Sequence, residues 1–151
     1  SNFAHDGFIC RHNMKYWVGD EYLGFGPCAA SDFAGRRFTI KPDLEGYIKG
    51  VMDKGQILSE SELVPLRERA GEYLMLRLRT VDGIEKGEYT RSFLLPFEPI
   101  EEILLRLQTQ EYAAFTSGRW HLTPKGFMLS NTILVELLEA QQKSKPLAQK
   151  R

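Results

Sequence analysis

The stretch YAAFTSGRWHLTPKGF, residues 112–127, predicts a β-hairpin followed directly by a helix. Two short runs of strand-forming residues flank the turn-rich spacer Thr-Ser-Gly at 116–118. Thr123 offers a capping oxygen, and Pro124 presets the backbone for a first helical position. The strands are expected at 112–115 and 119–122, and the inner face of the following helix at Phe127, Ile133, Leu134, Leu137 and Leu138.

The sequence before this hairpin has the periodicity of helices. Pro65 suits the first position of a helix, and apolar residues recur behind it at intervals of three and four as far as Leu78. A short helix is expected after Gly83, and a longer one over about 97–108. The order helix, helix, hairpin, helix resembles a winged-helix module, so we expect a mostly helical domain over residues 56–142.

The N-terminal stretch is rich in glycine and aromatic residues and lacks helical periodicity. Apolar runs at 22–25 and 38–40 suit brief strands, whereas the spacing after Asp43 predicts a helix that ends at Gly55. Such a stretch cannot form a compact hydrophobic unit without more strands beside it. We therefore expect residues 1–55 to be the closing edge of a larger domain.

The composition is that of an ordinary globular protein, with 42% hydrophobic and 26% charged residues in 151. Lys plus Arg equals Asp plus Glu at 20 each, so no overall field favours nucleic acid or an anionic membrane. Two cysteines make no disulfide framework, and no window approaches the roughly 18 apolar residues of a membrane span. These two features lead us to expect a cytoplasmic protein. We expect the chain to be a segment of a longer protein, because it opens without Met or a signal pattern. We also expect an unordered tail over 143–151.

The segment CRHNMKYW, residues 10–17, holds the densest chemistry. On a helix, His12 and Tyr16 would share one face, as would Asn13 and Trp17. A neutral imidazole binds iron and aromatic rings stack on a flat macrocycle, so a porphyrin-type ligand suits this spacing. In the alternative interpretation, the imidazole hydrogen-bonds locally and the two aromatic side chains pack in a core.

Other kinds of site find weaker support. A zinc site could in principle use His5, Cys10, His12 and Cys28, which are the right ligand types. Structural zinc sites usually draw their ligands from two closely spaced pairs, and these residues do not form two such pairs. The glycine-containing loop after Tyr22 could approach a phosphate, yet it lacks a third glycine and a Lys-Ser/Thr ending, so a structural loop is favoured. DNA binding is opposed by the helix expected at 97–108, which carries Glu98, Glu101 and Glu102 against Arg106.

Several ordered motifs cover nearly the whole chain. They are SNFA at 1–4, GF-x-CRHN-x-x-YW across 7–17, YLG-x-GP across 22–27, GRR at 35–37, DLE-x-Y across 43–47, YLML-x-LR across 73–79 and LTPKG at 122–126. They resemble segments of oxygen-independent coproporphyrinogen III oxidase-like radical SAM proteins. In that family these segments follow a partial β/α barrel, whose three-cysteine motif holds an iron-sulfur cluster that cleaves S-adenosylmethionine; that motif is absent here.

The resemblance implies both a fold and a function. It implies an α+β chain, in which the terminal part of the partial barrel precedes the winged-helix-like domain. The family contains oxidases of porphyrin biosynthesis and heme chaperones, and the His-Asn-x-x-Tyr-Trp motif belongs to the chaperone branch. It therefore implies that His12 binds heme, with Asn13, Tyr16 and Trp17 in support, and that this segment alone cleaves no S-adenosylmethionine and oxidises no coproporphyrinogen.

The implied partners are heme or porphyrin, the N-terminal barrel of the longer protein and a heme-recipient protein. Two alternatives remain: a fragment of an oxidase, and a non-catalytic interaction domain that docks through residues 56–142. One loop departs from the family, which commonly reads Gly-Pro-Gly-Ala-His-Ser where this chain has GPCAAS at 26–31. Cys28 thus requires a more restricted backbone than glycine, and Ala30 removes whatever contact the usual histidine makes.

Overall fold

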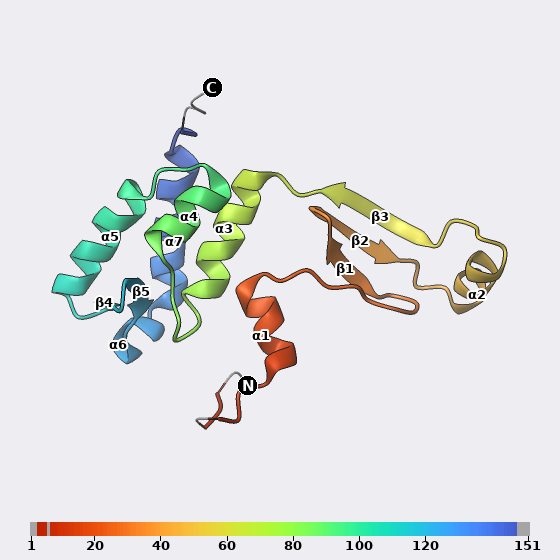
Figure 1. Cartoon of the computed structure of the whole chain (residues 1–151), viewed down its shortest axis with the longest axis horizontal. Coiled ribbons are helices and arrows are strands. Elements are labelled where there is room, and N and C mark those ends of the chain that lie inside the picture. The colour runs from red at the N-terminus through yellow and green to blue at the C-terminus, as the bar shows by residue number, and fades with distance from the viewer. Residues whose placement is uncertain (1–2, 6, 148–151) are drawn as a thin grey trace. The chain divides into compact units, whose positions relative to one another are not determined.

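The computed structural model describes residues 3–5 and 7–147 of the chain (Figure 1). It divides into a sheet unit, Asp20–Pro65, and a helical unit that combines Ser1–Gly19 with Leu66–Arg151. The expected mixture of helices and strands is confirmed. The expected domain division after residue 55, the partial barrel and the winged-helix likeness stay predictions.

The sheet unit contains a three-stranded antiparallel sheet in the order β1-β2-β3. Its elements are β1 (Ala30–Phe33), β2 (Arg36–Ile40), α2 (Leu44–Met52) and β3 (Leu58–Leu63). A tight turn joins β1 to β2, because Ala34 and Gly35 both adopt a positive φ, 51° and 75°. The strand expected at 22–25 is wrong in extent: it reduces to a single bridge between Tyr22 and Asp32.

Little of the sheet unit is buried. Its buried side chains are Ser31, Ile40 and Val64. Helix α2 buries no residue and exposes an apolar stripe at intervals of three and four, made of Leu44, Ile48, Val51 and Met52. Because burial of apolar surface is the main stabilising contribution to folding, this unit draws little stability from its own core.

The helical unit follows the expected order closely. Its elements are α1 (Arg11–Val18), α3 (Leu66–Arg77), α4 (Lys86–Phe93), α5 (Glu98–Thr109), β4 (Ala113–Thr116), β5 (Arg119–Leu122), α6 (Pro124–Phe127) and α7 (Ser130–Lys143). The hairpin and the Thr123 cap are confirmed, since the Thr123 hydroxyl accepts the Gly126 N–H at 3.1 Å. The expectation of a single helix after Pro124 is wrong. The helix is interrupted between Phe127 and Ser130, where the Leu129 N–H donates to the Gly126 carbonyl.

The core of the helical unit lies where α7 packs against α3 and α5 (Figure 1). Its fully buried side chains include Leu74, Leu78, Ile84, Tyr89, Phe97, Ile100, Leu104 and Leu137. The hairpin joins this core through Ile84 and Trp120, which exchange two backbone hydrogen bonds of 2.8 Å. At the other end of the hairpin, Gly126 lies so close to the Tyr112 carbonyl that any Cβ would collide with it. The hairpin is therefore held at both ends by backbone contacts.

Arg67 connects the beginning of α3 to the end of α7. Its guanidinium donates to the carbonyl oxygens of Gln141 and Gln142, each at 3.0 Å, and of Ser144 at 2.7 Å. In return, the buried Gln141 side-chain amide donates to the Arg67 carbonyl at 2.9 Å. The last carbonyls of a helix have no partner within the helix, so these donors satisfy them.

The residues after α7 correct an expectation. Residues 143–147, expected in an unordered tail, are held on the helical unit: Ser144 is buried, and the Leu147 N–H donates to the Leu94 carbonyl at 2.9 Å. A low apolar content did not prevent order, because the Arg67 guanidinium and the Leu94 carbonyl supply hydrogen-bond partners that composition does not reveal. Residues 148–151 of the same expectation lie outside the described part of the chain.

We predict that Arg67→Ala lowers the free energy of unfolding of the helical unit by about 2 kcal/mol, because three carbonyls lose a charged donor. Urea denaturation followed by circular dichroism measures this loss. The control is Arg79→Ala: Arg79 makes one exposed bond to Asn131, so its removal should cost within about 0.5 kcal/mol. Equal losses in the two variants would contradict the role of Arg67.

Two buried tyrosines also belong to this core. Burial raises the pKa of Tyr73 to about 12 and the pKa of Tyr89 to about 12. The Tyr73 hydroxyl accepts the Glu85 N–H at 3.4 Å, and both rings lie against Phe93, with centroid distances of 5.4 and 5.3 Å. Loss of either phenolic proton would therefore place a charge among apolar rings.

These shifts predict a loss of stability in alkali. Both folded-state pKa values exceed the unfolded value of 10, so the stabilisation is complete below pH 10 and is lost as the pH rises toward 12. Urea denaturation at several alkaline pH values should show a free energy of unfolding that falls as the pH rises. In the folded chain, the phenolate absorbance of two tyrosines should develop at a higher pH than that of an ordinary tyrosine. Tyr89→Phe should flatten that fall, and an equally steep fall in this variant would contradict the assignment to Tyr89.

Candidate functional site

Helix α1 brings two of the predicted site residues together. Its last turn is closed by Gly19, which has a φ of 76° and donates its N–H to the carbonyls of Lys15 and Tyr16. The His12 and Tyr16 rings stand nearly perpendicular, with centroids 5.3 Å apart and planes at 82°. The Tyr16 hydroxyl lies 3.4 Å from Nε2 of His12. The expectation that these two side chains share a helical face is thus confirmed.

The four predicted residues differ in exposure. His12 and Asn13 are exposed, Tyr16 is 41% exposed, and Trp17 is half-buried. Helix α1 lies beside α3 within the helical unit, yet none of its residues is fully buried. The alternative interpretation, in which both aromatic residues pack in a core, is therefore wrong for Tyr16. The role of these four residues in heme binding stays a prediction.

The chain leading into α1 adds apolar surface. Phe8 is 81% exposed and Ile9 is 54% exposed, and the Phe8 N–H turns back to the His5 carbonyl at 3.0 Å. Phe8 and Ile9 thus add exposed apolar side chains within four residues of the exposed His12 imidazole. Chemically, this site can offer a nitrogen lone pair to a metal and aromatic rings to a macrocycle.

The zinc alternative gains no support from the described part of the chain. Across residues 3–5 and 7–147, no group of three or more His, Cys, Asp or Glu side chains could hold a metal ion. Cys10 and Cys28 are both exposed free thiols.

The loop that departs from the family motif is shaped by close backbone packing. The Gly24 N–H donates to the Ser31 hydroxyl at 3.0 Å, and Gly24 has no room for a Cβ because the Ala30 carbonyl fills that space. Ser31 is fully buried in this structural role. Cys28 adopts a φ of 64°, the left-handed conformation that favours glycine. The expected constraint at Cys28 is confirmed.

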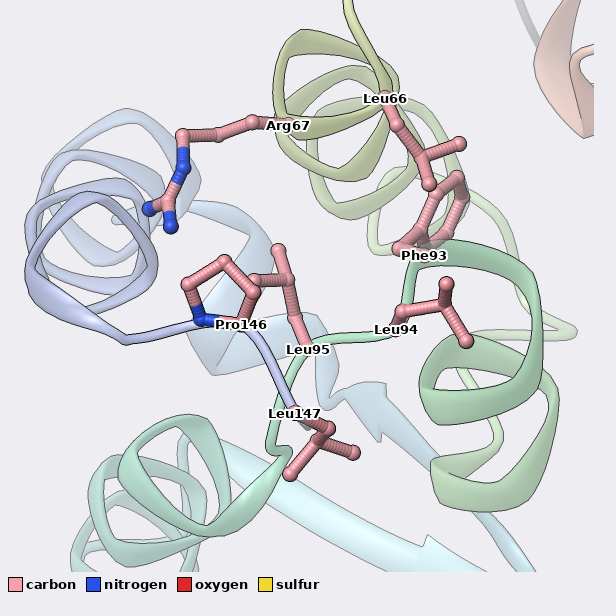
Figure 2. Close-up of a pocket in the computed structure, with 7 residues that line it drawn as sticks. All are labelled: Leu66, Arg67, Phe93, Leu94, Leu95, Pro146 and Leu147. Carbon is pink, nitrogen blue, oxygen red and sulfur yellow. The ribbon is translucent and has the colours of Figure 1, made fainter. Parts of the chain in front are cut away.

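One pocket was not predicted from the sequence. It has a volume of about 290 Å³ and is lined by Leu66, Arg67, Phe93, Leu94, Leu95, Pro146 and Leu147 (Figure 2). Its lining comes from three separate segments: the beginning of α3, the end of α4 with the connection to α5, and the residues after α7. Figure 2 shows the Arg67 guanidinium directed toward α7, where it is engaged by carbonyls. The pocket is thus mostly apolar, and the one charged side chain in its lining is already hydrogen-bonded to α7 and Ser144.

We predict that Cys28→Gly stabilises the sheet unit by up to about 1 kcal/mol, because glycine adopts the left-handed conformation without steric cost. Hydrogen exchange of the β1 and β2 amides measures the gain. Cys28→Ala is the matched control, since it removes the thiol but keeps the Cβ and should bring no gain. A gain of similar size in both variants would point to the thiol rather than the backbone.

Comparison with known proteins agrees with the resemblance seen in the sequence. Residues 64–129 match the family model described as the HemN C-terminal domain. The heme chaperone HemW of Lactococcus lactis is 30% identical over 139 residues, which cover 91% of this chain and 36% of that protein. HemW of Bacillus subtilis is 26% identical over 134 residues, covering 88% and 35% respectively. The chain thus spans little more than a third of the length of these relatives.

A solved structure also resembles the fold. It is that of coproporphyrinogen III oxidase (HemN) from Escherichia coli, described as a radical SAM enzyme. The TM-score is 0.56 over 82% of this chain and 29% of that one, at 15% sequence identity, so this match shows a shared fold only. The chain is therefore similar to the HemN and HemW proteins, and its residues 64–129 match the HemN C-terminal domain.

Proposed function

We propose that this chain is the part of a cytoplasmic heme chaperone that contacts heme as cargo before its delivery to a recipient protein. His12 is the proposed iron ligand, and Asn13, Tyr16 and Trp17 flank the porphyrin. The observation that carries the proposal is the exposed His12 imidazole with the Tyr16 ring standing against it. The relatives named heme chaperones support the choice of ligand.

The residues of this site fit a heme. A porphyrin needs an accessible lone pair for its iron and apolar surface for its faces, and the exposed imidazole and the apolar side chains before α1 offer both. A carrier must also release its cargo, so an open site on a short surface helix suits transfer better than an enclosed pocket would.

The exposed apolar stripe on α2 supports the view that another domain of a longer protein packs on this helix. We propose that an N-terminal barrel covers this stripe, and that the barrel holds the iron-sulfur cluster and S-adenosylmethionine for which this chain has no three-cysteine motif. In the described part of the chain, no helix is long and apolar enough to cross a membrane.

Two other functions remain candidates. A fragment of an oxygen-independent coproporphyrinogen III oxidase agrees with the fold match, although Ala30 stands where the family commonly has histidine. A non-catalytic interaction domain gains support from the apolar positions exposed in the range 56–142, among them Leu105, Met128 and Val135. Nucleic acid remains an unfavourable partner, because Glu98 and Glu101 of α5 share the single positive charge of Lys86, at 3.4 and 2.7 Å.

We predict that the chain binds hemin with a shift of the Soret absorption band and that His12→Ala weakens this binding by about tenfold or more, because the iron loses its ligand. Titration with hemin measures the affinity. His121→Ala is the control, since this histidine lies in β5 and should leave the affinity unchanged. An unshifted band in the wild-type chain, or the same shift in His12→Ala, would contradict the proposal.

A further inference from the structure

The Tyr16 hydroxyl and the proposed iron ligand meet at one atom. The hydroxyl lies 3.4 Å from Nε2 of His12, and the two rings stand nearly perpendicular. Nε2 is the ring nitrogen farther from the backbone, because Nδ1 is bonded to Cγ, the ring carbon that is attached to Cβ. The hydroxyl therefore contacts the nitrogen that extends furthest from α1.

That nitrogen is also the one through which a heme can most readily bind. A porphyrin is a broad plate, and ligation through Nδ1 would bring its edge against the backbone of α1, whereas Nε2 holds it away from the helix. A neutral imidazole has one lone pair, on whichever nitrogen lacks a proton. A hydrogen bond donated to Nε2 and a bond from Nε2 to iron use the same lone pair and exclude each other.

We propose that the Tyr16 hydroxyl donates to Nε2 of His12 in the heme-free chain and must leave that nitrogen when heme binds. Tyr16 is then a positioning residue that keeps Nε2 unprotonated and competes with iron for its lone pair. This inference rests on the proposed heme role of His12. On heme binding the hydrogen bond breaks and the dative bond from Nε2 to iron forms; on release the two changes reverse.

Such competition suits a protein that gives up its cargo. The helix keeps the two side chains in register in both states, because positions four apart stay on one face. As the bond to iron breaks, the hydroxyl is already close enough to occupy the lone pair, which opposes rebinding. The long distance and the exposure of both side chains indicate a weak competitor, so its effect is a modest acceleration of release.

The test compares wild type with Tyr16→Phe, which keeps the ring and removes the hydroxyl. Hemin affinity should rise, and transfer of hemin to an excess of a high-affinity scavenger should slow, each by about two- to fivefold, as expected for a weak exposed hydrogen bond. Tyr47→Phe is the control, because it removes a hydroxyl from α2 instead and should change neither value. Circular dichroism checks that α1 keeps its helicity.

A second measurement requires no heme. In nitrogen-15 NMR of the heme-free chain, the Nδ1–H tautomer of His12 should be more populated in wild type than in Tyr16→Phe. If wild type binds no hemin, or His12→Ala binds it normally, the heme role fails and this inference fails with it. If His12→Ala abolishes binding but Tyr16→Phe matches wild type or binds more weakly, only the competition by Tyr16 is overturned.

Discussion

The hydrogen bonds between Arg67 and the end of α7 are the interaction on which the helical unit depends. They join segments 74 or more residues apart and give a charged donor to three carbonyls at the end of α7. With that end held, α7 can bury Leu134 and Leu137 against α3 and α5, and the residues after it can reach the Leu94 carbonyl. One guanidinium thus supports both the core and the segment that lines the pocket.

The two units differ in how they are stabilised. The helical unit has a continuous core, whereas the sheet unit is held chiefly by its strand ladder, by tight turns and by the hydrogen bond from Gly24 to Ser31. The proposed heme site lies on α1, a short helix beside this core with no fully buried residue. A rigid unit can hold such a helix in place while its outer face remains open to a large ligand.

Local signals were sufficient for much of the fold and for part of the site. The hairpin at 113–122 and the Thr123 cap follow from turn and capping residues that act over a few positions. No local pattern predicts β1 or β3, because neither Ala-Ser-Asp-Phe nor Leu-Ser-Glu-Ser-Glu-Leu contains a run of strand-forming residues or a clear apolar and polar alternation. The break between α6 and α7 was missed because both helices carry apolar residues that fit one continuous period.

Residue spacing and type alone predict that His12 and Tyr16 share a helical face, that the chain resembles the coproporphyrinogen III oxidase-like family, and that Cys28 stands in a position suited to glycine. These follow from spacing and residue type, which act locally. The folded structure was needed to establish that α1 leaves these side chains exposed, that the Tyr16 hydroxyl lies near Nε2 of His12, and that Arg67 reaches α7. Burial and side-chain contacts depend on which distant segments pack together, and no local pattern encodes that.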